Sequence, residues 1–142
     1  MRLHEQRQVD RPQKEVFDYT ADFSNIADWD PGVAASRRLG TGPLGVGTRF
    51  ELEVEFGPST IPMVYEITAF EPHQRVVLTG RGKTLEAVDE ITFRAVGEDT
   101  IIDYTADLRF LNWVRFAIPF VSPLLRRVGE RAVDGLVSAL SR

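Results

Sequence analysis

The 142-residue chain contains no cysteine and only two histidines, His4 and His73. Without thiols there is no disulfide, no thiolate metal site and no cysteine nucleophile. The two histidines are far apart in sequence, and neither has a partner at the spacing of metal ligands, so we predict no bound metal. A G-x-S-x-G motif is also absent, which argues against a hydrolase of the Ser-His-Asp type.

The chain also lacks a long apolar run and an excess of positive charge. Its longest apolar stretch, residues 110–121, is interrupted by Asn112, Arg115 and Pro119, and a membrane-spanning helix needs about 20 apolar residues. The N-terminal residues are polar and form no signal-peptide core, so we expect a cytoplasmic protein. The net charge is −4, which predicts no nucleic-acid surface because such surfaces carry a basic stripe.

What remains is an ordinary globular composition. Hydrophobic residues make up 43% of the chain and charged residues 27%, values that argue against disorder. The length suits one domain with a single core and room for a pocket. No repeat, linker or low-complexity segment divides the chain, so we expect one domain over residues 1–142.

The apolar periodicity predicts one strand, two short helices, a series of strands and a long helix. The predicted elements are a strand at 3–9, helices starting at Pro12 and at 23–27, strands at 48–56, 61–70, 76–79, 85–96 and 101–111, and a final helix from Pro123, capped by Ser122. The apolar stripe of that helix is Leu125, Val128, Ala132, Leu136 and Ala139. This order predicts an α+β fold, an antiparallel sheet with helices on one face.

Residues 40–47 contain the pattern G-x-G-x-x-G at Gly40, Gly42 and Gly45. A dinucleotide site needs this pattern between a strand and a helix, because the helix N-terminus holds the pyrophosphate. Here Pro43 interrupts the pattern and a strand follows. We therefore interpret the segment as a turn that uses glycine's tolerance of positive φ, and we predict no cofactor.

Several polar residues lie in phase with the apolar positions of their strands. Asp89 alternates in step with apolar neighbours, as do Tyr104 and Tyr65, and Arg7 lies on the apolar phase of the first strand. A buried carboxylate is costly unless it has a partner, and Arg7 is one candidate for Asp89. These groups would orient a mostly apolar ligand. The alternatives are a structural ion pair, or a bulge that turns Asp89 to solvent.

Two further features each allow two readings. Asp28 and Asp30 flank Trp29, and the pair either binds a cation or shares a proton, or caps local turns while Trp29 packs against the sheet. Gly129 and Gly135 lie inside the final helix, where each costs about 1 kcal/mol relative to alanine. They either leave space for a ligand or allow close helix–sheet packing.

The segment Phe110 to Val121 is rich in large apolar side chains. It belongs to the core, or it forms an apolar lip at a cavity mouth, a homodimer contact, or a surface that touches a lipid bilayer.

Three segments together resemble a known superfamily. They are VDRPQKEVFDYTADFSNIADWDPGV at 9–33, Gly45-Val46-Gly47-Thr48 opening a strand, and ITAFEP at 67–72. The chain resembles the START-related, polyketide cyclase/dehydrase-like (SRPBCC) proteins, which share the helix-grip fold of the birch-pollen allergen. The resemblance implies a curved antiparallel sheet that grips the C-terminal helix around an apolar cavity. Members bind lipids, sterols, quinones or polyketides, and a minority are enzymes.

We therefore expect the chain to bind a small hydrophobic molecule, for carriage or sequestration, rather than to act as an enzyme. The alternative is a cyclase or dehydratase in which Asp89 is the general base and Tyr104 or Arg7 stabilises an enolate. The expected ligand-binding residues are Arg7, Trp29, Phe50, Leu52, Val54, Met63, Tyr65, Ile67, Leu78, Asp89, Ile91, Phe93, Tyr104, Leu108, Leu125, Gly129 and Leu136. The apolar members would supply affinity, and the polar ones would set orientation.

Overall fold

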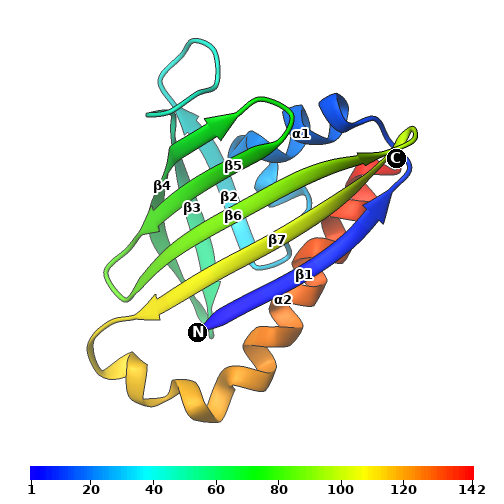
Figure 1. Cartoon of the computed structure of the whole chain (residues 1–142). Helices are drawn as coiled ribbons and strands as arrows, with labels where there is room; N and C mark the ends of the chain where they lie inside the picture. The colour runs from blue at the N-terminus through cyan, green and yellow to red at the C-terminus, as the bar shows by residue number, and fades with distance from the viewer.

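A seven-stranded antiparallel sheet and one long helix dominate the computed structural model, which describes residues 1–142 (Figure 1). The strand order is β1-β7-β6-β5-β4-β3-β2. The elements are β1 (Arg2–Val9), α1 (Gln13–Ala21), η1 (Phe23–Asp28), β2 (Val33–Leu39), β3 (Arg49–Phe56), β4 (Ser59–Glu71), β5 (Arg75–Arg81), β6 (Leu85–Val96), β7 (Asp99–Phe110), η2 (Asn112–Phe116) and α2 (Ile118–Leu140). The predicted α+β helix-grip fold is confirmed.

The helices cover one face of a curved sheet. In Figure 1 α2 runs diagonally behind the sheet, and it packs against β1, while α1 contacts β6 and β7. Register shifts interrupt the β2–β3 and β4–β5 ladders, and such bulges bend the strands that carry them. The sheet therefore wraps around the helices, and the core lies in its concave face.

The strand phases predicted from sequence are confirmed. On β6 the inward positions Leu85, Ala87, Asp89, Ile91 and Phe93 are all buried. No bulge interrupts the pairing of β6 with β7, so the alternative that turns Asp89 to solvent is wrong. Because successive strand residues face opposite sides, this register aims the Asp89 side chain into the concave face.

The strand β2 was not predicted from the sequence. This segment, VAASRRL, has no regular apolar alternation, and only Val33 within it is buried. It is an edge strand paired with β3 alone, so one of its edges has no strand neighbour. Edge strands carry polar and charged residues that discourage further pairing, which removes the periodic signal on which the prediction depends.

The long helix begins five residues earlier than predicted. It starts at Ile118, with Ala117 as the N-cap residue, so Ser122 does not cap it and Pro123 lies inside it. A second proline, Pro119, occupies the first turn, where a missing N–H costs nothing. Pro123 predicted a helix start by the same rule, but Pro119 is the proline in the first turn of α2.

The glycine-rich segment at 40–47 is a loop that leads into β3, as predicted. Gly40, Gly42 and Gly47 have positive φ angles of 85°, 98° and 94°, a region that favours glycine. The Gly47 N–H donates a hydrogen bond to the Ile67 carbonyl on β4 at 2.8 Å. The loop therefore anchors the start of β3 to β4 and precedes no helix.

Candidate functional site

A cavity of about 180 Å³, partly open to solvent, lies between the concave face of the sheet and the middle of α2. Sixteen of its 22 lining residues are hydrophobic, so it suits an apolar molecule. The lining consists of Leu3, Glu5, Ile26, Asp30, Gly32, Val33, Leu52, Val54, Glu55, Phe56, Tyr65, Leu85, Asp89, Tyr104, Ala106, Leu108, Phe110, Leu125, Val128, Gly129, Ala132 and Val133.

Asp89 and Tyr104 form the polar part of the cavity wall. The Tyr104 hydroxyl donates a hydrogen bond to Oδ2 of Asp89 at 2.5 Å, and the Asp89 side chain belongs to a residue only 6% exposed. The pKa of Asp89 is raised to about 7, mainly by burial. The hydrogen bond from Tyr104 opposes this rise, and the negative charge of Asp30 contributes to it. Burial also raises the pKa of Tyr104 well above its ordinary value, so its hydroxyl remains a donor.

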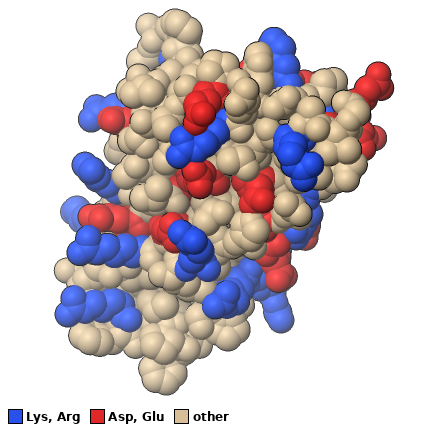
Figure 2. Space-filling model, in the orientation of Figure 1, with Lys and Arg blue, Asp and Glu red and all other residues tan.

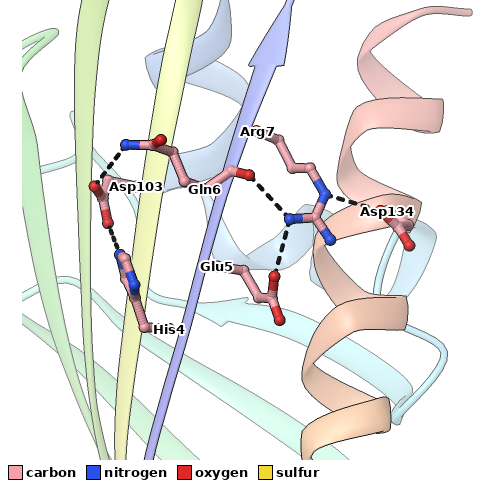
Figure 3. A network of polar contacts seen from close by, with 6 residues as sticks. All are labelled: His4, Glu5, Gln6, Arg7, Asp103 and Asp134. Atoms are coloured by element: carbon pink, nitrogen blue, oxygen red, sulfur yellow. Dashed lines mark hydrogen bonds and ion pairs between the residues drawn. The ribbon is translucent and has the colours of Figure 1, made fainter.

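Arg7 does not pair with Asp89, so that expectation is wrong. Its guanidinium bonds instead to Glu5 at 2.9 Å and to Asp134 on α2 at 3.0 Å (Figure 3). Arg7 shares the inward phase of β1, but α2 passes over this edge of the sheet and supplies Asp134. The arginine thus ties β1 to α2 and is absent from the cavity lining.

Asp30 lies in the cavity wall without having been expected there. Its Oδ1 accepts a hydrogen bond from the Gly32 N–H at 2.8 Å, which confirms the turn-capping interpretation for this residue. Burial raises its pKa to about 6, against the opposing effect of the Gly32 hydrogen bond. Trp29 is 3% exposed and packs edge-on against Phe23 and Tyr104, as the same interpretation requires.

Tyr65 reaches the cavity because a glycine faces it on the neighbouring strand. Gly80 of β5 pairs with Tyr65 of β4, and a Cβ at Gly80 would lie 2.5 Å from the tyrosine ring. The ring therefore lies over β5 in the space that a side chain would fill. Burial raises the pKa of Tyr65 well above its ordinary value, and Asp89 and Asp30 add to this effect.

The structure divides the expected ligand-binding residues into two groups. Those in the lining are Leu52, Val54, Tyr65, Asp89, Tyr104, Leu108, Leu125 and Gly129. Those in the solid core are Trp29, Phe50, Met63, Ile67, Leu78, Ile91, Phe93 and Leu136, each at most 4% exposed.

α1 and η1 cover part of the concave face and keep some of the second group out of the lining. Phe17 of α1 packs edge-on against Phe93, and Phe23 of η1 packs against Phe50 and Tyr65. Strand phase identifies inward residues but does not show which of them a distant helix covers. Ala106 and Asp30 line the cavity but were not among the expected ligand-binding residues. Ala106 could have been predicted, because it shares the strand phase of Tyr104. Asp30 lies in a loop, where no periodicity indicates which side chains point inward.

The two helix glycines serve close packing, and one of them also lines the cavity. A Cβ at Gly135 would overlap the backbone carbonyl oxygen of Trp29, so α2 approaches the chain there at backbone distance. A Cβ at Gly129 would lie 3.3 Å from Cδ1 of Leu3, and Gly129 borders the cavity. The packing interpretation therefore holds for both glycines, and Gly129 in addition borders the cavity.

The segment Phe110 to Val121 is partly core and partly exposed. Phe110 and Val114 are buried, whereas Trp113, Phe116 and Phe120 are 75%, 66% and 85% exposed. With Leu124, which is 60% exposed, these three form a surface that we call the apolar lip. In Figure 2 the lower end of the molecule, where η2 and the start of α2 lie in Figure 1, is mostly tan.

The chain contains no group of three or more His, Asp or Glu side chains arranged to hold a metal ion. None of its helices combines the length and hydropathy needed to cross a bilayer.

Solved structures with the same fold cover nearly the whole chain. A protein from Thermus thermophilus has a TM-score of 0.83 at 14% identity, covering 99% of this chain and 97% of its own. An aromatase/cyclase from a Streptomyces species has a TM-score of 0.81 at 13% identity, covering 100% and 94%. A START superfamily protein from Mycobacterium smegmatis has a TM-score of 0.74 at 13% identity, covering 98% and 93%. At these identities the likeness shows the fold alone.

No curated protein matches the sequence. The model of one family, described as polyketide cyclase / dehydrase and lipid transport, matches residues 1–141, which confirms the resemblance drawn from the sequence. The cavity, the curved sheet and the long helix thus accompany a family match along almost the entire chain. The chain belongs to the polyketide cyclase / dehydrase and lipid transport family.

Proposed function

We propose that the protein reversibly binds a small hydrophobic molecule in the cavity, for carriage or sequestration. The observation that carries this proposal is an apolar hollow with a few convergent polar groups, Asp89, Tyr104 and Asp30, in its wall. That combination is typical of small-molecule sites, in which apolar walls give affinity and polar groups give orientation. Family membership supports the proposal, because the family includes lipid transport proteins.

The size of the cavity limits what fits without movement. An apolar cavity of about 150 Å³ holds a benzene-sized molecule, so about 180 Å³ accepts one ring with a short substituent. Affinity would come from apolar area removed from water, at about 25 cal/mol per Å² before the costs of association. A larger ligand would need the middle of α2 to move away from the sheet.

A cavity-filling substitution tests the proposal. Ala132 of α2 lines the cavity, whereas Ser138 lies on the exposed side of the same helix. We expect Ala132→Phe to weaken binding of the neutral probe 4-phenylbutanol, measured by calorimetry, by about tenfold or more, with Ser138→Phe as the matched control that binds normally. Equal affinity in both variants would place the probe outside the cavity and contradict the proposal.

A second candidate function is proton abstraction, favoured by the contact between Asp89 and Tyr104. Asp89 in its ionised form would take a proton from the carbon next to a ligand carbonyl, leaving an enolate and a neutral carboxyl group. That neutral group holds the Tyr104 hydroxyl less tightly, which frees the hydroxyl to donate to the enolate oxygen. The pKa of Asp89, about 7, suits a base that works near neutral pH.

Isotope exchange tests this second candidate. Acetophenone in D₂O would gain deuterium at its methyl group faster with the protein than with Asp89→Asn, measured by NMR. The rate would rise with pH through the ionisation of a group near pH 7, matching the pKa of Asp89 of about 7. A rate that is independent of pH above the usual carboxylate range would exclude Asp89 as the base.

We further propose that the apolar lip contacts an anionic membrane surface, from which a ligand would enter the cavity. Residues 109–129 include Arg109, Arg115, Arg126 and Arg127 but no acidic residue, although the chain carries a net charge of −4. In Figure 2 blue side chains flank the tan lower end, and the red atoms lie above it. Exposed aromatic residues beside arginines match a bilayer interface with anionic headgroups.

Vesicle sedimentation tests the lip. We expect binding to phosphatidylcholine vesicles that contain phosphatidylglycerol, weaker binding to phosphatidylcholine alone, and loss of binding in the double variant Trp113→Ser, Phe120→Ser. The double variant Val88→Ser, Val96→Ser removes exposed apolar side chains from β6 and serves as the control. Absence of vesicle binding together with a lip-dependent dimer in solution would show that a second copy covers the lip, and would overturn the membrane proposal.

A further inference from the structure

The charged residues that line the cavity all have the same sign. Glu5, Asp30, Glu55 and Asp89 are in the lining, and no lysine, arginine or histidine is. Glu5 is paired with Arg7 at 2.9 Å, and Glu55 is an exposed residue. Asp30 and Asp89 are therefore the two carboxyl groups that face the apolar hollow without a cationic partner.

We propose that the ligand is a hydrophobic amine. Its protonated nitrogen would contact the Asp89 carboxyl group, and its hydrocarbon part would pack against the face of α2 that lines the cavity. This inference rests on the proposed binding function and names the chemical class of the ligand. The inference follows from the lining. Two carboxyl groups face the cavity without a cationic partner, and an ammonium group on the ligand would supply the missing positive charge.

The Asp89 side chain is arranged to accept a further donor. It is more than nine-tenths buried, and only its Oδ2 receives a hydrogen bond, from Tyr104. Oδ1 has no donor within the chain and keeps accessible surface, so a ligand in the cavity is able to reach it. An ammonium N–H would satisfy this oxygen and offset the buried charge, and such charge-assisted hydrogen bonds are the strong ones.

Asp30 strengthens the preference for a cation. It lines the same cavity, and the only donor to its side chain is the Gly32 N–H at 2.8 Å. Its charge raises the pKa of Asp89, so the two carboxyl groups are close enough to interact. Because both carboxyl groups act on one space, a fatty acid or phosphate placed there would meet repulsion from both, while an ammonium would be attracted by both.

The ionisation of these groups adds a pH dependence to binding. A protonated amine favours the ionised carboxylates, so affinity should increase as pH rises through about 6 and about 7, the pKa values of Asp30 and Asp89. The other charged or titratable groups in the lining are Glu5 from β1, Glu55 from β3, Tyr65 from β4 and Tyr104 from β7, and α2 contributes none. The pKa values of both tyrosines are raised well above their ordinary value, so neither tyrosine ionises in this range.

Three probes with one carbon skeleton separate charge from shape. They are 4-phenylbutylamine, 4-phenylbutanol and 4-phenylbutyrate, titrated into the whole protein by calorimetry at about pH 8, above the two raised carboxyl pKa values. We expect the amine to bind about tenfold or more tightly than the alcohol and the acid to bind weakest. At about pH 5 the advantage of the amine over the alcohol should largely disappear, because both carboxyl groups are then neutral.

Asp89→Asn keeps the shape of the side chain and removes its charge. In this variant the amine should lose its affinity advantage over the alcohol. Glu86→Gln removes one charge from the outer face of the same strand and should change neither affinity. If Asp89→Asn does not fold, Asp30→Asn is the alternative variant. It should also reduce the affinity of the amine relative to the alcohol.

The outcomes separate the ligand class from the proposed function. If the alcohol binds in the cavity and the amine binds no more tightly, or if the acid binds best, the amine inference is overturned and the binding function stands. If none of the three probes binds, both are overturned. An amine advantage that persists in Asp89→Asn and in Asp30→Asn would also overturn the inference.

Discussion

The Tyr104 hydroxyl lies 2.5 Å from Oδ2 of Asp89 although the two residues are not directly opposite each other. In the β6–β7 ladder Asp89 faces Ala106 and Tyr104 faces Ile91, so the hydrogen bond spans the diagonal between the strands. A long aromatic side chain is able to cover that distance. The small side chain of Ala106 leaves the space beside Asp89 open, and this space is part of the cavity.

Removing the Tyr104 hydroxyl should destabilise the protein. Tyr104→Phe deletes the hydrogen bond to a buried carboxyl group, and we expect a loss of about 1–2 kcal/mol in the free energy of unfolding. Urea denaturation would measure it. Tyr19→Phe is the control, because no hydrogen bond involves the hydroxyl of Tyr19 in α1. A loss as large in the control would show that the ring contacts, rather than the bond to Asp89, dominate.

The stability of the ligand-free protein should fall as pH rises from about 4 to about 8. The folded pKa of Asp89 is raised from 3.8 to about 7, so the folded state binds more protons than the unfolded state within this range. Stability therefore decreases with pH, by at most about 4 kcal/mol from this residue. Asp30, with a pKa of about 6, adds an effect of the same sign.

Asp89→Asn should flatten that pH dependence. Because the amide carries no charge at any pH, the variant should be as stable as the parent or more so at about pH 8, and its advantage should shrink towards pH 4. Denaturant midpoints at several pH values would measure the effect, with Glu86→Gln as the surface control. A parent protein whose stability rises from pH 5 to pH 8 would contradict the assignment of a raised pKa to Asp89.

Alanine at the two α2 glycines should have opposite consequences. Gly135→Ala places a methyl group on the Trp29 carbonyl oxygen, and overpacking of this kind costs about 1–3 kcal/mol. Gly129→Ala meets only the end of the Leu3 side chain at 3.3 Å, and it gains helix propensity of about 1 kcal/mol. In thermal unfolding, the Tm of Gly129→Ala should be higher than that of the parent protein, and the Tm of Gly135→Ala should be lower. The reverse order would refute the packing described for the two glycines.

The same reasoning applies to Gly80. A Cβ there would lie within 2.8 Å of three atoms of the Tyr65 ring, so Gly80→Ala should displace the ring and destabilise the protein by about 1–3 kcal/mol. Gly45→Ala is the control, because nothing lies within 4 Å of its Cβ position and its φ is not positive. Circular dichroism in the near ultraviolet would report the altered tyrosine environment in the first variant only.

The features that the sequence predicted well are those that local periodicity determines. The inward phase of Asp89, Tyr104 and Tyr65 was correct because side chains alternate along a strand without reference to the rest of the chain. The long helix and the glycine-rich turn were found from signals of the same local kind. The short edge strand β2 was missed because its residues VAASRRL carry no such pattern.

The features that could not be predicted depend on contacts between distant segments. Arg7 was expected in the cavity, but Asp134, 127 residues later, holds it on α2. Phe50 was expected to contact a ligand, but η1 fills the space in front of it with Phe23. The cavity therefore occupies only part of the concave face, and sequence phase alone carries no information on its boundary.

The most direct test of the account is an NMR titration of the ¹⁵N-labelled protein with 4-phenylbutanol, a neutral probe that fits the cavity whatever the charge preference of the natural ligand. We predict saturable chemical-shift changes that cluster at Asp89, Tyr104, Ala106 and Ala132, and that disappear in Ala132→Phe. Changes confined to the apolar lip, or no saturable changes at all, would contradict a ligand-binding cavity beneath α2.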